Sequence, residues 1–462
     1  MKTLKYIPQQ LYIIVLTIFI IGCEDNLELE PEQSLLPEIA TSNPANVQNI
    51  LTGIYDEAGQ NVSYGGRLNL ASELLANDTD LSWNGTFEQP AQLIEKQLVP
   101  DNTFVRDYWL NAYEVSNQAN IVLANLAVFE EESDRDRVEG EAKFLRGLVY
   151  FDLVRFFGQP YSAGGGNTQL GVPIILKAVL DPSDVTFPER KTVEEVYTHI
   201  INDLSEAYNL LPESNGISAD KYAAQALLAR VYLQQGNYEA ARDAANDVLQ
   251  NSGHSLAELY AAAFNNDEDS DEDIFAWQIT SQDPGEVAPG IGTGGNDMNT
   301  FWATREFGGR SPSADVSVEP SFFTIFDDPN DERNQFFYND NSVSLKWQSQ
   351  FANIPFLRIA EMHLIRAEAN FRLGTNVGLT PLEEINALRD RVSAIPLIAL
   401  TLQDIIDERK RELAFEGFAL HDVKRLEGTV GGLNYDDNFL VLPIPQRERD
   451  VNPDGLPQNP GY

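Results

Sequence analysis

The sequence predicts a mostly α-helical protein in which helical hairpins alternate with loop-rich insertions and a few short strands. Apolar residues recur at three- and four-residue steps over long stretches, which is the spacing of one helix face. Glycine, proline and aromatic residues collect between these stretches, and such compositions favour loops. Hydrophobic residues make up 43% of the 462 residues, so the chain can bury a globular core.

The N-terminus has the pattern of an export signal. Lys2 and Lys5 give it a positive start, and a short apolar run extends from Leu11 to Ile21. This run is shorter than the roughly 18 apolar residues that a membrane-spanning helix requires. We therefore expect residues 1–22 to be a cleaved signal peptide.

The single cysteine of the chain, Cys23, directly follows that run. The sequence Ile20-Ile21-Gly22-Cys23 resembles a bacterial lipobox, which predicts a lipoprotein with lipid attached to Cys23. The alternative is a cysteine that follows an apolar leader by chance. Residues 23–40 begin with an acidic stretch and are predicted to form a tether, either as a surface-sorting signal or as a solvated linker. With one cysteine, an internal disulfide is impossible.

The charge balance excludes one class of partner. The formal net charge is −39, and loss of Lys2 and Lys5 with the leader makes it −41. A field of this sign repels phosphate backbones and anionic lipid, so nucleic acid is not expected as a ligand. It also repels acidic glycans unless local arginines reverse the potential. We therefore expect a neutral ligand.

The clearest helix runs from Thr192 to Leu211, where apolar residues recur with helical spacing. Thr192 and Glu195 have the spacing of a capping box, in which each side chain accepts from the other residue's backbone N–H. Pro212 marks the end of the helix.

Three further segments carry small and aromatic residues in a predicted helix that stops at glycine: Phe144 to Gly158, Ala223 to Gly236 and Phe356 to Gly374. The middle segment continues into a second helix ending near Leu249, and this hairpin resembles a tetratricopeptide unit. Tandem arrays of such units repeat about every 34 residues, whereas these glycines are much further apart. Large insertions must therefore interrupt the hairpins, which we place near residues 105–158, 190–250 and 354–393.

The region 252–353 is predicted to be an inserted, loop-rich segment. Pro284 to Gly295 and Gly308 to Pro320 have loop composition. The short apolar stretches Ile274 to Ile279 and Phe439 to Leu442 are candidate strands, although their length alone does not decide between strand and helix.

Four motifs, in this order along the chain, resemble those of the SusD/RagB family of outer-membrane nutrient-binding lipoproteins. The first is EAKFLRGLVYFDLVRFFG at Glu141 to Gly158, followed by Gly171-Val172-Pro173. The third is IDERKRELAFEG at Ile406 to Gly417, and the fourth is Leu442-Pro443-Ile444-Pro445. One departure follows the third motif, where Phe418 to Val423 lacks the basic-aromatic pair that is common in the family.

The resemblance implies one SusD-like domain over residues 41–462, with four degenerate tetratricopeptide units. It also implies a cell-surface protein that binds oligo- or polysaccharide and delivers it to a SusC-like, TonB-dependent transporter. The helical face would meet the transporter, and the glycan would lie on the opposite, loop-rich side. Neither catalysis nor a cofactor is expected.

A saccharide site needs aromatic platforms with polar groups at the rim. Trp83 and Trp302 lie in polar loop sequence, in the two regions where family members place ligand contacts. We therefore predict both as platforms, with Asp80, Asn84 and Arg305 as polar companions. Alternatively, each indole anchors its own loop.

Tyr64, Arg67 and Trp347 are further candidates for the ligand site. Trp109 and Trp277 lie in apolar surroundings with helix-like and strand-like spacing, respectively, so we predict that both belong to the core.

No metal site is predicted. The acidic run Asn265 to Asp273 lacks the glycine and glutamate that an EF-hand loop requires, so a solvated loop is the simpler interpretation. The four histidines have no metal-ligand spacing.

Two other functions stay open. A surface glycoside hydrolase needs two suitably spaced carboxylates, and 71 acidic residues always provide some pair. A peptide-binding adaptor is the second alternative, because tetratricopeptide grooves hold peptides and RagB-like relatives serve peptide uptake.

Overall fold

The computed structural model describes residues 37–281 and 296–462. Helices dominate, as predicted from the apolar periodicity. The α-helices are α2 (Pro37–Ala40), α3 (Pro44–Gly59), α4 (Arg67–Leu75), α5 (Glu88–Glu95), α6 (Thr103–Ala124), α7 (Glu132–Phe157), α8 (Val193–Leu210), α9 (Lys221–Gln234), α10 (Tyr238–Asn251), α11 (Asp297–Trp302), α12 (Ile359–Leu373), α13 (Pro381–Arg391), α14 (Leu402–Glu412), α15 (Ala419–Arg425) and α16 (Gln446–Val451).

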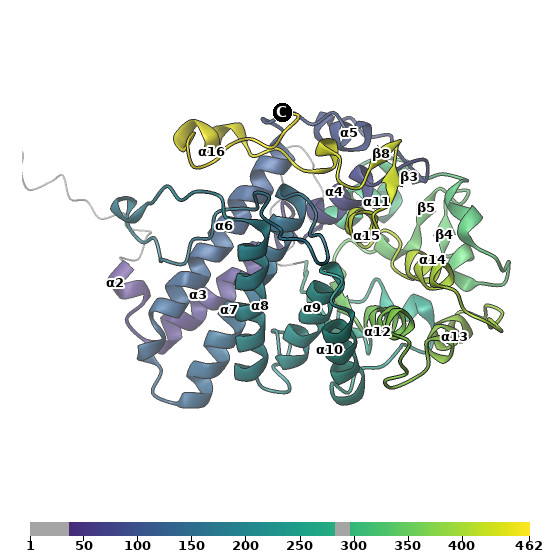
Figure 1. The fold of residues 1–462 in the computed structure, drawn as a ribbon, viewed down its shortest axis with the longest axis horizontal. Coiled ribbons are helices and arrows are strands. Elements are labelled where there is room, and N and C mark those ends of the chain that lie inside the picture. Colours follow the sequence, from purple (N-terminus) through teal and green to yellow (C-terminus); the bar gives the residue numbers. More distant parts are fainter. Residues whose placement is uncertain (1–36, 282–295) are drawn as a thin grey trace, which may run out of the picture.

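The long helices pack in a row. Contacts run from α3 to α6, then through α7, α8, α9 and α10 to α12, which also packs against α13 and α14. Figure 1 shows this row spanning the molecule, with α14, α15 and most of the short strands gathered at one end. The predicted hairpins α9–α10 and α12–α13 are both present.

Helices α7 and α8 approach closely because glycines face α8. A Cβ on Gly147 would lie 3.0 Å from the Leu204 side chain, and one on Gly140 would lie 2.7 Å from Leu211. The predicted capping box at Thr192 and Glu195 is confirmed, with α8 beginning at the next residue after Thr192.

The strands form four two-stranded antiparallel sheets: β1 (Leu81–Trp83) with β3 (Val316–Val318), β2 (Asp273–Trp277) with β6 (Ile354–Arg358), β4 (Phe337–Tyr338) with β5 (Val343–Ser344), and β7 (Thr429–Val430) with β8 (Leu433–Asn434).

Three expectations about strands can be compared with this arrangement. The candidate strand at Ile274 to Ile279 is confirmed as β2. The helix predicted to begin at Phe356 is wrong there, because residues up to Arg358 pair with β2 and α12 starts afterwards. The candidate strand at Phe439 to Leu442 is also wrong, since a 3-10 turn occupies Asn438–Leu440.

A buried cluster of ion pairs joins the inserted region to α14. The Glu412 carboxylate lies 2.7 Å from Arg391, 3.2 Å from Arg333 and 3.4 Å from Arg358. Burial would raise the pKa of Glu412, but Arg391, Arg358 and Arg333 outweigh it and hold the pKa below its ordinary value. One turn further on, Glu416 pairs with Lys346 at 2.5 Å.

The predicted signal peptide, Cys23 and most of the tether lie outside the described residues. The last four residues of the predicted tether, 37–40, form the short helix α2. Among the helices of the described ranges, none combines the length and hydropathy that crossing a membrane requires.

Candidate functional site

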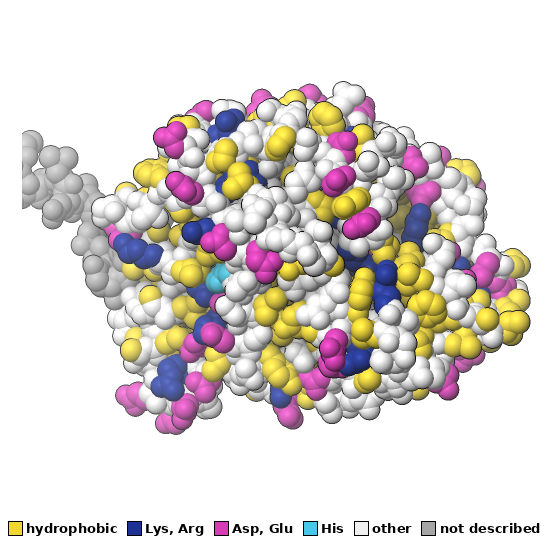
Figure 2. Space-filling model, in the orientation of Figure 1, with side chains coloured by type: hydrophobic (Ala, Val, Ile, Leu, Met, Phe, Trp, Pro, Cys, Tyr) yellow, Lys and Arg dark blue, Asp and Glu magenta, His cyan; other side chains and the backbone are white. Residues whose placement is uncertain are grey.

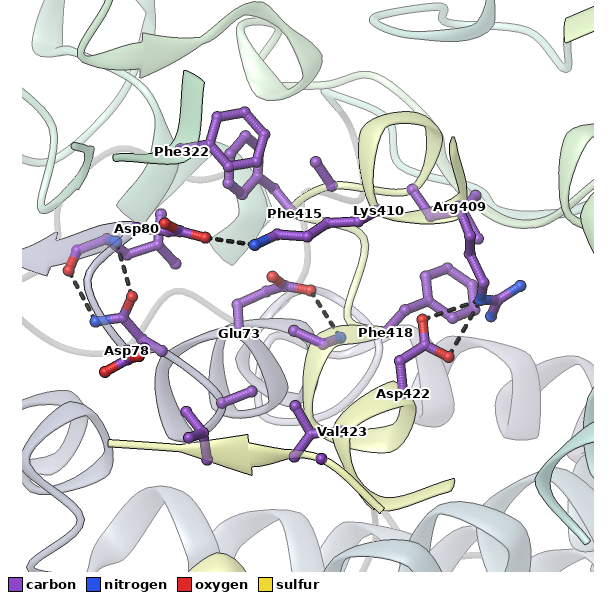
Figure 3. Close-up of a pocket in the computed structure, with 18 of the residues that line it drawn as sticks. Glu73, Asp78, Asp80, Phe322, Arg409, Lys410, Phe415, Phe418, Asp422 and Val423 are labelled. Atoms are coloured by element: carbon purple, nitrogen blue, oxygen red, sulfur yellow. Dashed lines mark hydrogen bonds and ion pairs between the residues drawn. The ribbon is translucent and has the colours of Figure 1, made fainter. Parts of the chain in front are cut away.

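A pocket of about 440 Å³ lies between the loop that follows α4 and the segment α14–β7. Figure 3 shows Asp78 and Asp80 on one side and Arg409, Phe418 and Asp422 on the other. The lining residues are Glu73, Ala76–Leu81, Phe322, Ile406, Arg409, Lys410, Leu413–Phe415, Phe418, Ala419, Asp422, Val423, Leu426 and Gly428–Val430. This size suits a small organic ligand or a few saccharide units.

Aromatic rings form one end of the pocket. Phe322, in a 3-10 turn, and Phe415 have ring centroids 4.9 Å apart. Phe418 is half-buried, and the guanidinium of Arg409 lies 4.9 Å from its ring centroid. Trp302 packs behind Phe415, at 5.3 Å between centroids. Phe322, Phe415 and Trp302 are each at most 3% exposed, so the half-buried Phe418 supplies the accessible apolar surface.

Two ion pairs lie in the pocket wall, and one of them joins its two sides. Lys410 Nζ donates to Asp80 Oδ2 at 2.6 Å, which bridges positions 330 residues apart in sequence. Arg409 donates to Asp422 at 2.9 Å. Burial would raise the pKa of Asp422, but Arg409 and Arg425 outweigh it and lower the pKa below its ordinary value.

Helix α4 holds the N-terminus of α15 in place beside the pocket. Ser72 Oγ accepts from Leu420 N at 3.2 Å, and Glu73 Oε1 accepts from Gly417 N at 2.8 Å and Ala419 N at 3.4 Å. These bonds satisfy backbone N–H groups that a helix start leaves free. Burial raises the pKa of Glu73 to about 7, although the backbone donors act in the opposite direction.

Among the predicted site residues, Asp80 alone lines this pocket. Trp83, the last residue of β1, and Asn84, which follows it, do not line the pocket. Trp83 is half-buried, and its Nε1 donates to Phe87 O at 3.1 Å. A Cβ on Gly85 would lie 2.3 Å from the indole, so the ring covers its own loop. Asn84 is exposed and donates to Ser317 Oγ at 2.9 Å.

The structure contradicts the prediction that Trp302 is an exposed platform. Its exposed fraction is 1%, and all six residues of α11 are buried. The polar flanking sequence was misleading because polar residues such as Asn299 are themselves buried and donate to backbone carbonyls. Arg305 is exposed beyond the end of this helix and donates to Arg310 O. It does not line the pocket.

Tyr64, Arg67 and Trp347 are also buried, so the expectation that they meet a ligand at the surface is not supported. Tyr64 donates to Asp152 at 2.7 Å, and Arg67 donates to Asp297 at 2.8 Å. Trp347 Nε1 donates to a backbone carbonyl. By contrast, Trp109 and Trp277 lie in the core, which confirms their prediction.

The residues that sequence reasoning missed belong to the IDERKRELAFEG motif and the residues that follow it. Lys410 and Phe415 line the pocket, whereas Glu412 and Glu416 of the same motif face the buried ion-pair cluster. The spacing of apolar residues did not reveal which charged residues of the motif line the pocket and which face the buried cluster, because charged side chains occur on both sides of it.

Within residues 37–281 and 296–462, no group of three or more His, Cys, Asp or Glu side chains is arranged to hold a metal ion. In the acidic run, Asp269 accepts from Gln278 and Asn353, and Asp273 accepts from Ser270.

Comparisons with known proteins identify the family. A family described as "Starch-binding associating with outer membrane" matches residues 25–233, and the SusD family matches residues 208–440, which is half of the chain. The chain belongs to the SusD/RagB family. The SusD-like protein P2 of Formosa agariphila is 27% identical, over 97% of this chain and 98% of the relative. The starch-binding protein SusD of Bacteroides thetaiotaomicron is 28% identical over 27% of each chain.

Solved SusD structures have the same fold. A SusD superfamily protein from Bacteroides thetaiotaomicron superposes with a TM-score of 0.78 at 26% identity, over 90% of this chain and 99% of that one. A putative sugar-binding protein from Bacteroides vulgatus gives a TM-score of 0.78 at 27% identity, over 90% and 98% of the two chains.

Proposed function

We propose that this chain is an outer-membrane lipoprotein, anchored at the cell surface through Cys23, that binds neutral oligo- or polysaccharide in the pocket beside α14. It delivers the glycan to a SusC-like, TonB-dependent transporter and does not cleave it. The observation that carries the proposal is the aromatic and charged pocket, which the SusD motif helix α14 lines in a chain of that family. The names of two relatives, a starch-binding protein and a putative sugar-binding protein, agree with a saccharide ligand.

The pocket has the chemistry that saccharides need. The half-buried ring of Phe418 offers apolar surface for a C–H face, and Asp80 and Lys410 offer an acceptor and a donor for hydroxyls. Cationic side chains in the pocket are paired with carboxylates, so it has no free positive charge for an acidic sugar. Figure 2 shows lysine and arginine in separate small groups among acidic, apolar and other side chains on the face that it presents.

Asp80→Ala or Lys410→Ala should weaken saccharide binding about tenfold, because each removes a charge-assisted hydrogen-bonding group at the pocket mouth. The Lys410 side chain is 53% exposed, so loss of this surface ion pair should leave the melting temperature within about 2 °C of wild type. The measurement is calorimetric titration with maltoheptaose, laminarihexaose and inulin, alongside thermal melting.

Lys177→Ala is the matched control. Lys177 forms a comparable exposed pair with Asp184 at 2.8 Å, and neither residue lines the pocket. This variant should bind as wild type does. Equal binding by all three variants and wild type would remove the pocket from the proposed function, and failure of wild type to bind any of the three glycans would reject neutral saccharide as its ligand.

Binding without turnover is the second expectation. Incubation of wild type with maltoheptaose or laminarihexaose should leave oligosaccharide length unchanged, as measured by chromatography. New reducing ends in excess of the protein concentration would instead support the glycoside hydrolase alternative, provided that an Asp80→Ala sample, prepared identically, controls for contaminating enzyme.

A further inference from the structure

Glu73 places one carboxylate oxygen in the pocket that its structural bonds do not use. Oε1 accepts both backbone hydrogen bonds from the segment before α15. Among the described residues, Oε2 has no hydrogen-bond partner, and it is absent from the set of fully buried unsatisfied atoms. Figure 3 shows the carboxylate with one oxygen bonded to a backbone nitrogen and the other turned toward the Asp80–Lys410 side.

The charged groups around Glu73 are already committed to other partners. Lys410 pairs with Asp80 across the pocket, and Arg409 pairs with Asp422 on one side of it. Behind the pocket, Lys346 and Glu416 act on Glu73 electrostatically but pair with each other at 2.5 Å. The remaining charged side chain that lines the pocket is that of Asp78, which is exposed in the loop after α4. No cation therefore neutralises Glu73 by direct contact.

We infer that Glu73 is a specificity-determining residue of the pocket: its free oxygen accepts a hydroxyl hydrogen from a neutral saccharide and repels a saccharide that carries carboxylates. This inference rests on the proposed function and names the group that selects the ligand class. A carboxylate is acceptor-only, and its hydrogen bonds from hydroxyls are stronger than neutral ones. An anionic sugar placed against Glu73 would meet like charge where burial leaves little solvent to screen it, and the exposed Asp78 adds a second, better screened negative charge.

The inference predicts a pH-dependent affinity. Burial raises the pKa of Glu73 to about 7, so the carboxyl gains its charge as the pH rises through neutrality. Since the charged form is the better acceptor, wild type should bind maltoheptaose, laminarihexaose or inulin about tenfold more tightly at about pH 8.5 than at about pH 5.5. None of the residues that line the pocket is a histidine, the side chain that ordinarily titrates in this range.

The experiment compares wild type, Glu73→Gln and Asp273→Asn by calorimetric titration at both pH values, with oligogalacturonate as the anionic probe. Glutamine retains an oxygen for the backbone donors but cannot ionise. Asp273 is the matched control, because burial raises its pKa to about 7 as well and it does not line the pocket. Glu73→Gln should bind the neutral glycan with a flat pH profile and should bind oligogalacturonate more tightly than wild type does. Asp273→Asn should keep the wild-type profile.

A wild-type affinity that does not change with pH would overturn the inference while leaving the proposed function intact. So would a pH profile that Glu73→Gln preserves. If wild type binds none of the neutral glycans, the proposed function fails and the inference falls with it. Glu73→Gln could fail to fold if α15 loses part of its cap. The pH profiles of glycan affinity for wild type and Asp273→Asn then test the inference. A pH response that both proteins show supports Glu73, and a response that Asp273→Asn loses contradicts the inference.

Discussion

Glu412→Ala should lower the free energy of unfolding by about 3 to 5 kcal/mol, because it removes the carboxylate that three buried arginines share. Each arginine keeps another carboxylate, from Asp331, Glu408, Glu272 or Glu416, but the cluster is left with excess positive charge. The three arginines around Glu412 are each at most 4% exposed, so bulk water cannot solvate their charges in place of the Glu412 carboxylate. The measurement is denaturant unfolding at neutral pH, compared with wild type.

Glu132→Ala provides the control for loss of one negative charge. Its side chain is 83% exposed and its nearest pairing, with Arg135, is at 3.8 Å, so the unfolding free energy should change by less than about 0.5 kcal/mol. The low pKa of Glu412 in the folded chain has a second consequence. Its stabilisation is present at neutral pH and is lost as the pH falls below about 4, so the two variants should become more alike in acid. Equal stability of both variants at neutral pH would show that the cluster contributes nothing net.

Trp302→Ala should also cost about 3 to 5 kcal/mol of unfolding free energy, as expected for truncating a fully buried aromatic side chain. Its indole packs against Phe415, and its exposed fraction is 1%. Because Phe415 lines the pocket, weaker glycan binding should accompany the loss of stability. Thermal melting and glycan titration on the same preparation test this.

Trp83→Ala is the informative comparison, since both tryptophans were candidate platforms. Trp83 is half-buried, so its replacement should destabilise less than that of Trp302. A Trp302→Ala protein with wild-type melting temperature and lost binding would restore Trp302 as a direct ligand contact.

Local patterns predicted the helices well. The Thr192 and Glu195 capping box depends only on nearby residues, and it appears as expected. Residues Ile354–Arg358 were misassigned because their apolar run fits either a helix or a buried strand. The choice depends on β2, which lies far away in sequence.

The site was less accessible to sequence reasoning for the same reason. The loop at Asp80 was predicted, and it does line the pocket. Its partner across the mouth, Lys410, is 330 positions away, and no pattern links the two. Trp302 is covered in part by Phe415, which is also far from it in sequence. Sequence motifs identified the family, but the three-dimensional packing decides which aromatic side chains reach the surface.

The cluster around Glu412 also bears on the order in which the chain completes its fold. Arg333, Lys346 and Arg358 are made well before their counter-charges Glu408, Glu412 and Glu416. During synthesis, Arg333 and Arg358 can pair with the earlier carboxylates Asp331 and Glu272, but Lys346 lacks its partner Glu416 until the last tenth or so of the chain arrives. We expect the inserted region to be the last part of the chain to become resistant to proteases. Truncation before residue 408 should prevent this region from folding stably.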